Sequence, residues 1–299
     1  MGVCHNILGL VGKTPMIRLN RVVSNIPAVV MAKLECFNPS GSTKDRIVLS
    51  MVLDAERRGL IHPGITLVEA TSGNTGIGLA VVTTVKGYKL LLTMPESVST
   101  ERRKILKALG AEIVLTPADK GTDGAIEEAY ELARQNPQKY CLMDQFNNEH
   151  NWIAHYKTTA PEIWKQTEGK VTMFVAGMGT TGTLMGVGRY LKQKNPMIRV
   201  IGVEPYLDHK IQGLKNMREA YKPGIYDRNV IDEKINVYDE DAYEMTRRLA
   251  KKEGLFVGMS SGAAMHVALH KAEELNEGLI VVLFPDGGER YLSTNLFLE

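Results

Sequence analysis

The amino-acid sequence predicts an α/β protein with two domains, each built around a mostly parallel sheet. The chain has 299 residues, and the usual size of about 150 residues for one domain favours two domains. Short apolar runs alternate with longer amphipathic runs along nearly the whole chain. The short runs are rich in valine, isoleucine and leucine, as in parallel strands that helices cover on both faces.

The predicted strands are short apolar runs that polar or glycine-containing segments separate. We place them at residues 28–34, 66–69, 89–94, 112–116, 140–143, 172–176, 199–203 and 279–284. Helical periodicity lies between them, at residues 99–110, 124–134, 182–192, 240–254 and 261–275. In the first of these helices Ser99 is a suitable N-cap and Gly110 a suitable C-cap.

A polar segment at residues 147–150 separates two blocks of this alternating pattern. We take this segment as the candidate domain boundary. Loops at the carboxyl ends of parallel strands are the usual ligand-binding positions in α/β proteins. A shared site in a cleft between the two domains is therefore expected.

The composition is that of an ordinary soluble globular protein. Charged residues make up 23% of the chain, the formal net charge is +2, and no block of lysine and arginine stands out, so no nucleic-acid partner is expected. No apolar run reaches the roughly 20 residues of a membrane span, and the N-terminus lacks the features of a signal peptide. Cys4, Cys36 and Cys141 fit neither a disulfide framework nor a CxxC metal site, which favours the cytoplasm.

Residues 177–183, Gly-Met-Gly-Thr-Thr-Gly-Thr, lie between a predicted strand and a predicted helix. Backbone N–H groups at a helix N-terminus, with three threonine hydroxyls nearby, suit a phosphate dianion. The segment is not a Walker A motif, because Thr183 stands where that motif has its lysine.

The same loop matches the dinucleotide-binding pattern G-x-G-x-x-G, and Glu204 ends the next strand 22 residues after Gly182. An NAD-dependent dehydrogenase that uses the loop from Gly177 to Gly182 is therefore an alternative, and the motif alone does not separate the two interpretations. The threonines of the loop and a separate lysine site favour phosphate alone. A tight turn without a ligand explains the glycines but not the threonines.

Lys44 follows a turn-rich segment at residues 38–43 and begins an apolar helical run. The positive end of the helix dipole and the loss of hydration in a pocket both favour the neutral amine. A neutral amine can condense with an aldehyde and can take a proton from a substrate carbon. The plain alternative is a surface lysine that pairs with Asp45 or another carboxylate. The small-residue loops elsewhere in the chain favour the catalytic interpretation.

A second loop, residues 71–76, offers hydroxyls and amides without charge between a strand and a helix. Such a loop suits a substrate carboxylate, and Asn74 suits a phenolic oxygen on a cofactor ring. Helix capping by Ser72 or Asn74 explains this loop equally well in isolation.

A third loop, residues 258–262, contains Ser260 and Ser261 at the start of a predicted helix. Capping is the structural alternative for one of these serines. A hydroxyl that faces a pyridine nitrogen does not hold the ring protonated as a carboxylate would, and the weaker electron sink favours elimination.

No metal site is predicted. His266 and His270 are spaced i, i+4, but Val267 stands where the zincin motif has its glutamate. Surface or packed histidines are the simpler interpretation.

In their order and spacing, the motifs around Lys44, Asn74, Gly179 and Ser260 resemble those of the fold-type II pyridoxal-phosphate enzymes. The closest resemblance is to the cysteine synthases (O-acetylserine sulfhydrylases) of the cysteine synthase/cystathionine β-synthase family. It covers nearly the whole chain, including residues 10–19, 144–148 and 285–294.

The resemblance implies a tryptophan synthase β-like fold of two three-layer α/β domains, with the active site in the cleft between them. Residues 37–147 would form the smaller N-terminal domain. Residues 1–36 plus 148–299 would form the larger C-terminal domain, which carries the phosphate loop. A homodimer is also implied.

Roles for individual residues follow from the same resemblance, with pyridoxal 5′-phosphate as the cofactor. Lys44 would be the catalytic residue and form the internal aldimine, Asn74 would contact the 3′ oxygen, and Ser260 would face the pyridine nitrogen. The residues expected to cradle the phosphate are Gly179, Thr180, Thr181, Gly182 and Thr183. The residues expected to hold the substrate carboxylate are Thr71, Ser72, Thr75 and Gln145.

Subtype features are mixed. Residues 144–148 resemble the B-type cysteine synthases and residues 209–213 the A-type. Pro285 stands where B-type enzymes that accept thiosulfate have a cysteine. Lys215 stands in a segment that holds an arginine in enzymes using O-phosphoserine, so it is a further candidate for substrate binding. A lysine would meet a phosphate as a point charge and not bidentately.

These implications predict a β-replacement that makes L-cysteine from an activated serine, with O-acetylserine as the expected donor and sulfide or a thiol as the acceptor. Lys44 would remove the Cα proton, and loss of the leaving group would give an α-aminoacrylate. The leaving group and the nucleophile stay open, so cystathionine β-synthase and O-phosphoserine sulfhydrylase are alternatives. A catalytically silent binding protein is a further alternative, against which intact Lys44, Asn74, Gln145 and Ser260 argue.

Overall fold

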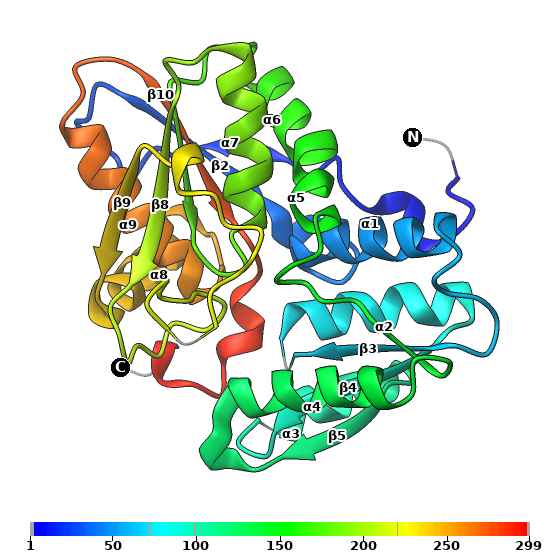
Figure 1. The fold of residues 1–299 in the computed structure, drawn as a ribbon. Coiled ribbons are helices and arrows are strands. Elements are labelled where there is room, and N and C mark those ends of the chain that lie inside the picture. Colours follow the sequence, from blue (N-terminus) through cyan, green and yellow to red (C-terminus); the bar gives the residue numbers. More distant parts are fainter. Residues whose placement is uncertain (1–2, 72, 99, 220, 298–299) are drawn as a thin grey trace. The chain divides into compact units, whose positions relative to one another are not determined.

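The structure is a computed structural model that describes residues 3–71, 73–98, 100–219 and 221–297. It divides into two compact units (Figure 1). The smaller unit combines Met1–Val11 with Lys44–Asn151, and the larger unit combines Gly12–Thr43 with Trp152–Glu299. Both units are α/β structures with mostly parallel sheets, which confirms the predicted fold class. The predicted domain limits at residues 37 and 147 stay a prediction.

The larger unit contains a six-stranded sheet in the order β1-β2-β10-β7-β8-β9. Its strands are β1 (Met16–Arg18), β2 (Val29–Leu34), β7 (Met173–Gly177), β8 (Arg199–Pro205), β9 (Glu233–Val237) and β10 (Leu279–Phe284). Neighbouring strands are parallel, except that β1 pairs antiparallel with β2. Successive side chains of a strand point to opposite faces. Accordingly, Val175 and Ala176 of β7 belong to two different apolar clusters.

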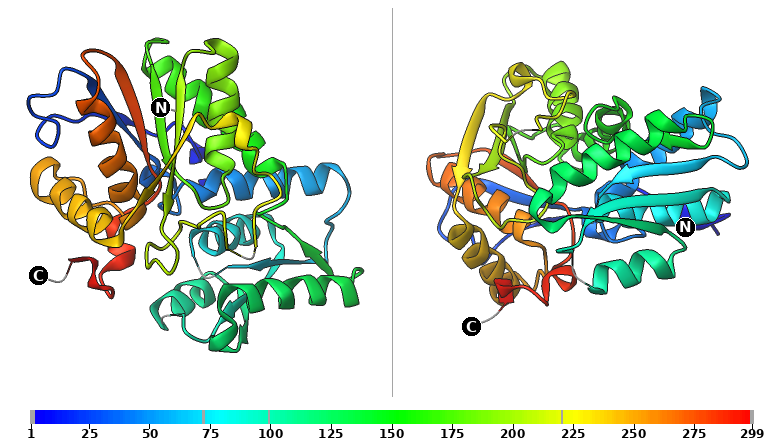
Figure 2. Two further views of the ribbon diagram at one scale, coloured as in Figure 1. Left: turned by 60° about the vertical axis from the view of Figure 1, so that its left-hand side comes forward. Right: turned by 60° about the horizontal axis from the view of Figure 1, so that its bottom comes forward.

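Helices cover both faces of this sheet (Figure 2). On one face, α8 (Asp239–Glu253) and α9 (Met259–Glu273) supply the apolar cluster that contains Val175. On the other face, α6 (Ala160–Gln166) and α7 (Gly182–Lys194) supply the cluster that contains Ala176. The chain reaches α6 through α5 (His150–Ala154) and one π-helical turn, His155–Thr159.

The smaller unit contains a four-stranded parallel sheet in the order β5-β4-β3-β6. Its strands are β3 (Thr66–Ala70), β4 (Lys89–Pro95), β5 (Glu112–Thr116) and β6 (Tyr140–Leu142). Its helices are α1 (Lys44–Arg57), α2 (Asn74–Lys86), α3 (Thr100–Ala108) and α4 (Gly121–Gln135). Helix α4 packs against all four strands, while α2 packs against β4, α1 and α3.

All the strands predicted from apolar runs are present, with ends that differ by at most two residues. The predicted helices are present as well. Gly110 adopts a positive φ of 88° just after α3, as a C-cap glycine does, whereas Ser99 lies outside the described residues. Strands β1 and β9 and the helices between residues 150 and 166 were not predicted. β1 has three residues and β9 is mostly half-exposed, so neither gives the apolar run that marks a buried strand.

Candidate active site

Lys44 is the first residue of α1 and is half-buried. The start of α1 packs closely on α2 at Gly78, one helical turn after Asn74. A Cβ added to Gly78 would lie 3.0 Å from Val48 and 3.6 Å from the backbone nitrogen of Asp45. A glycine at this position therefore lets the helix that begins with Lys44 approach the helix that begins with Asn74.

The loop that precedes α2 presents small polar groups at a helix N-terminus. Asn74 is the first residue of α2, and Gly73 is its N-cap residue. Thr71 accepts a hydrogen bond from the backbone N–H of Gly73 at its Oγ1 (3.2 Å), which fixes the loop. Thr75 is buried, and Ser72 lies outside the described residues. The first backbone N–H groups of such a helix have no intrahelical acceptor, so they suit an anion.

Thr75 and Gln145, far apart in the sequence, are hydrogen-bonded. The Thr75 hydroxyl donates to Oε1 of Gln145 (2.7 Å), and the backbone N–H of Gln145 donates to Oε2 of Glu69 (3.1 Å). Burial raises the pKa of Glu69 to about 8, against the hydrogen bonds from Gln145 and Ala70. A carboxyl group in β3 thus contacts Gln145, which in turn is hydrogen-bonded to Thr75.

In the larger unit, the loop between β7 and α7 has the form of an anion cradle. Thr181 is the N-cap residue of α7 in the left-handed conformation (φ 68°). Its hydroxyl oxygen is buried and has no hydrogen-bond partner among the described residues. A Cβ added to Gly179 would lie 2.4 Å from the carbonyl oxygen of Gly213, so the position requires glycine. Thr180 accepts from the backbone N–H of Gly182 at 3.4 Å.

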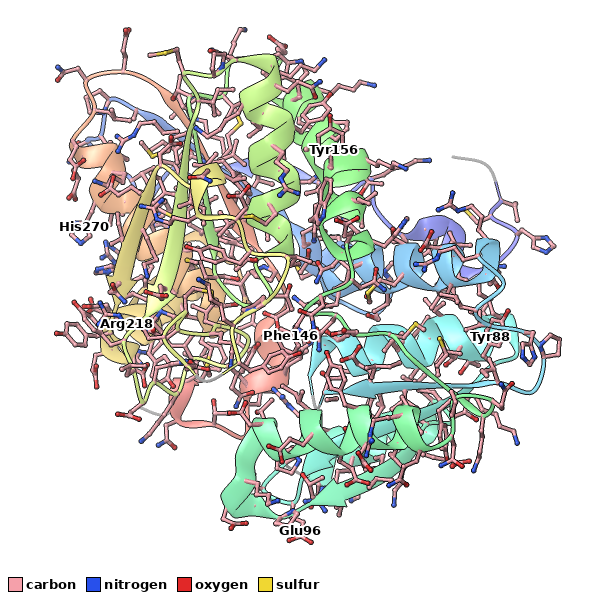
Figure 3. All side chains as sticks on the ribbon, viewed as in Figure 1. Tyr88, Glu96, Phe146, Tyr156, Arg218 and His270 are labelled. Carbon is pink, nitrogen blue, oxygen red and sulfur yellow. The ribbon has the colours of Figure 1, made fainter. Side chains whose placement is uncertain are left out.

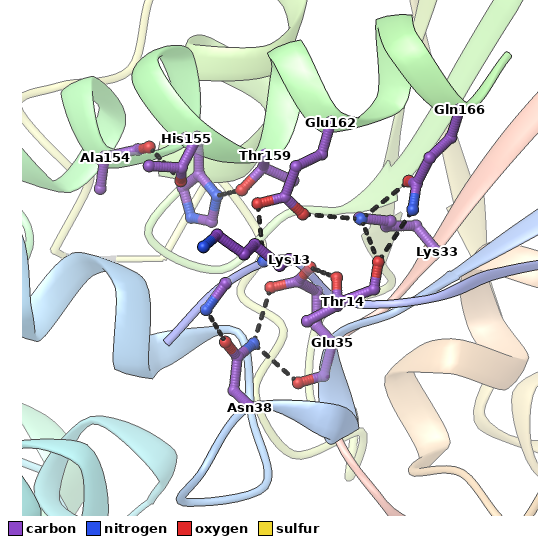
Figure 4. A network of polar contacts seen from close by, with 12 residues as sticks. Lys13, Thr14, Lys33, Glu35, Asn38, Ala154, His155, Thr159, Glu162 and Gln166 are labelled. Atoms are coloured by element: carbon purple, nitrogen blue, oxygen red, sulfur yellow. Dashed lines mark hydrogen bonds and ion pairs between the residues drawn. The ribbon is translucent and has the colours of Figure 1, made fainter. Parts of the chain in front are cut away.

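His155 supports the end of this loop from the π-helical turn. Its Nε2 lies 3.3 Å from Oγ1 of Thr183, and its Nδ1 lies 2.9 Å from Oγ1 of Thr159. The second of these contacts is drawn in Figure 4. His155 is buried, and Gly186 lets α7 approach this turn, because a Cβ there would lie 2.6 Å from Cβ of His155.

Ser260 is the second residue of α9 and is buried. The start of α9 is held by the segment that follows β10, since the backbone N–H of Gly258 donates to the carbonyl of Asp286 (3.1 Å). The same segment holds the residues that precede Lys44. Ser42 forms a bridge with Asp286, and the N–H of Thr43 donates to the carbonyl of Pro285 (2.8 Å).

The residues of the phosphate loop fit pyridoxal phosphate. The hydroxyl of Thr181 is a buried group without a partner among the described residues, the position of Gly179 excludes a side chain, and the loop ends at a helix N-terminus. Uncharged donors of this kind bind phosphate dianions. Among the described residues, no group of three or more His, Cys, Asp or Glu side chains is arranged to hold a metal ion.

Comparison with protein families agrees with this fit. A family model described as "Pyridoxal-phosphate dependent enzyme" matches residues 7–286. This chain belongs to that family.

Relatives within the pyridoxal-phosphate dependent enzyme family are similar over nearly the full length. A cysteine synthase from Aquifex aeolicus is 52% identical over 303 residues, which cover 99% of this chain and 93% of that protein. Cysteine synthase B from Escherichia coli is 44% identical and covers 97% of this chain and 95% of that protein. The crystal structure of cysteine synthase (OASS) from Entamoeba histolytica matches with a TM-score of 0.95 and 41% identity, covering 99% of this chain and 91% of that chain.

The alternative of a dehydrogenase is not favoured by these findings. Glu204, the carboxylate that would bind a ribose, is buried at the end of β8. It accepts from the backbone N–H of Met217 (2.6 Å) and pairs with Lys234 (2.7 Å). A structural role for this carboxylate is therefore sufficient.

The remaining charged candidates are held by local partners. Lys215 lies next to the loop between β7 and α7, because its backbone N–H donates to the carbonyl of Met178 (2.7 Å). Its ammonium pairs with Glu219 (2.7 Å). His266 and His270 stack edge to face on α9, with ring centroids 4.6 Å apart. His270 projects outward from the helix (Figure 3), and burial lowers the pKa of His266.

Among the described residues, no helix is long and apolar enough to cross a membrane.

Two residues that contact predicted site residues, one in each unit, were missed by the sequence analysis. Glu69 gave a usable signal, because an acidic residue interrupts the apolar run of a buried strand directly before the loop at residues 71–76. His155 gave none, since its partner Thr183 lies 28 residues away.

Proposed function

We propose that this pyridoxal-phosphate dependent enzyme is a cysteine synthase, which replaces the leaving group on Cβ of O-acetylserine by sulfide. The similarity to proteins named cysteine synthase over 97–99% of the chain is the observation that carries the proposal. The uncharged phosphate loop and the lysine at the start of α1 support it.

The candidate residues hold the cofactor and move the proton at the substrate Cα. Pyridoxal phosphate supplies an electron sink for a carbanion at the substrate Cα. Lys44 holds the cofactor aldehyde through Nζ and moves the Cα proton as a general base. Asn74 donates to the 3′ oxygen, and Ser260 meets the ring nitrogen. The phosphate is held by Gly179, Thr180, Thr181, Gly182 and Thr183.

The substrate carboxylate is assigned to the N-terminus of α2 and the segment after β6. Helix N–H groups and hydroxyls stabilise a carboxylate without a counter-charge. The residues assigned to it are Thr71, Ser72, Thr75 and Gln145.

Lys215 bears on the choice of donor. It already pairs with Glu219 at 2.7 Å, and a carboxylate beside it repels a phosphate dianion. The ion pair therefore supports O-acetylserine over O-phosphoserine.

The proposal is tested by assaying cysteine formation with the cofactor-loaded protein. O-acetylserine with sulfide is expected to react faster than O-phosphoserine with sulfide or serine with homocysteine. Removing a general base costs roughly 10²–10⁴-fold in rate, so Lys44→Ala is expected to lose at least that factor. Lys139→Ala, at an exposed lysine of the same unit, serves as the control and keeps the wild-type rate. Turnover by Lys44→Ala at the wild-type rate would contradict the role of Lys44.

A cytoplasmic location and a homodimer complete the proposal. All three cysteines are free thiols, which suits a reducing compartment. Cell fractionation tests the location. Light scattering measures the molecular mass in solution and tests the dimer. A mass near the 33.1 kDa of one chain would contradict a homodimer.

A further inference from the structure

A chain of contacts connects a buried carboxyl group to the substrate-binding loop. Glu69 in β3 is fully buried and accepts the backbone N–H groups of Ala70 and Gln145, one at each oxygen (3.1 Å each). Nε2 of Gln145 lies 3.5 Å from Oε1 of Glu69 and 3.5 Å from the carbonyl oxygen of Ala70. Oε1 of Gln145 accepts the hydroxyl proton of Thr75 (2.7 Å).

The acceptors around Gln145 decide which way its amide points. Two oxygens, from Glu69 and Ala70, face one end of the amide. Placing Oε1 at that end would oppose acceptor to acceptor, so the nitrogen lies there and the oxygen faces Thr75. The Thr75 hydroxyl must then give its proton to Gln145.

This orientation does not suit the binding of a carboxylate. A hydroxyl has one proton to donate, and that of Thr75 is used by Gln145. Nε2 of Gln145 points at Glu69. Thr75 and Gln145, two of the four residues assigned to the substrate carboxylate, therefore direct their donors away from an incoming anion.

A proton on Glu69 reverses the chain. The protonated carboxyl donates to Oε1 of Gln145, and this hydrogen bond offsets the weak opposition of the Ala70 carbonyl at 3.5 Å. The amide turns over, and Nε2 then faces Thr75. The Thr75 hydroxyl accepts from this nitrogen, and its own proton becomes available for the substrate. The step moves one proton from solvent to Glu69 and breaks no covalent bond.

We propose that Glu69 is a positioning residue, which takes up a proton when the substrate carboxylate binds and thereby turns Gln145 and Thr75 into donors. The inference rests on the proposed function, because it assumes that Thr75 and Gln145 bind the carboxylate of an amino acid.

The surroundings of Glu69 favour uptake of a proton. Burial, together with the negative charge of Asp144, raises its pKa to about 8. Its partner across the sheet on β4 is Leu92, and the residues that α2 and α4 bury are uncharged. Asp45 at the start of α1 faces Gly78 on α2, and α1 also buries Arg46. Below about pH 8 the protonated state already prevails in the free protein, so proton uptake on binding is expected above that pH.

The test is calorimetric titration of the cofactor-loaded protein with L-alanine, which has no leaving group, in buffers of different ionisation enthalpy. The dependence on buffer gives the number of protons taken up. Glu69→Gln keeps the shape of the side chain, donates through its amide and cannot titrate. Glu56→Gln, at a carboxylate that pairs with Lys86 (2.8 Å) in the same unit, is the control.

The affinity that depends on Glu69 is present at low pH and is lost as the pH rises through its pKa of about 8. From about pH 7 to about pH 9, the ratio of wild-type to Glu69→Gln affinity is expected to fall roughly tenfold. Proton uptake near pH 8.5 is expected to be smaller in Glu69→Gln than in the wild type and in Glu56→Gln. Equal proton uptake in all three proteins would overturn the inference.

Infrared difference spectroscopy of the unmodified protein keeps the inference testable if Glu69→Gln fails to fold. Addition of L-alanine near pH 8.5 is expected to produce the carbonyl stretch of a protonated carboxylic acid. Its absence while L-alanine binds would overturn the role of Glu69 and leave the proposed function intact. If L-alanine does not bind and no donor reacts, the proposed function itself fails.

Discussion

Lys33 is a residue whose environment could not be deduced from the chain around it. The sequence analysis placed it in a strand, which β2 confirms, yet its side chain is fully buried. Its ammonium donates to the carbonyl of Thr14 (2.7 Å), to Glu162 (2.8 Å) and to Gln166 (2.9 Å), as Figure 4 shows. All three N–H groups are satisfied. Two of the partners come from α6, more than a hundred residues along the chain, and no local pattern predicts them.

This pairing predicts an asymmetry between two substitutions. Glu162→Ala leaves a buried ammonium without its counter-charge and is expected to cost about 3–5 kcal/mol of stability. Lys33→Met is expected to cost less, because Glu162 is 19% exposed and still accepts the N–H of Lys13 (2.8 Å). Urea unfolding followed by tryptophan fluorescence measures both, since Trp152 and Trp164 belong to the larger unit. A larger loss for Lys33→Met would contradict this account.

The candidate site residues also divide into those whose positions local sequence patterns predict and those whose contacts depend on distant parts of the chain. Lys44, Asn74, Ser260 and Thr181 stand at or beside helix starts, and local signals such as a strand followed by small polar residues predict such positions. Their roles stay predictions. Glu69 acts through Gln145, 76 residues away, and contacts of that range depend on the tertiary fold.

At the scale of elements, buried parallel strands and their helices were predictable, and edge strands were not. β10 lies between two strands and reads as six apolar residues, Leu279–Phe284. β9 lies at the edge and has the sequence EKINV with mostly half-exposed residues. An edge strand pairs with a neighbour on one side only and has a face in contact with solvent, so its sequence contains few apolar residues.

The loop between β7 and α7 supports a prediction about cofactor affinity. In Gly179→Ala the new Cβ would meet the carbonyl oxygen of Gly213 at 2.4 Å, so the loop must shift. Overpacking of this kind costs about 1–3 kcal/mol, and this loss is expected to weaken the affinity for pyridoxal phosphate by roughly fivefold to 150-fold. An absorbance titration of cofactor-free protein measures it. Gly9→Ala, with its nearest contact at 3.4 Å, is the control, and equal affinities for the two variants would refute the prediction.

For the whole molecule, the regular alternation of apolar and amphipathic runs predicted an α/β protein with parallel sheets, and the resemblance of the motifs implied fold type II. The likeness to solved structures confirms both, with a TM-score of 0.95 over 99% of the chain. Membership of the pyridoxal-phosphate dependent enzyme family follows from the match over residues 7–286. The assignment of the cofactor to one amine is the central claim that the proposed function adds.

Reductive trapping tests that claim most directly. Borohydride treatment of the cofactor-loaded protein fixes the linkage between aldehyde and amine, and mass spectrometry of the digested chain locates it. The account predicts one phosphopyridoxyl group per chain, on Lys44. Trapping on another lysine, or none in a protein that still holds the cofactor, would contradict it.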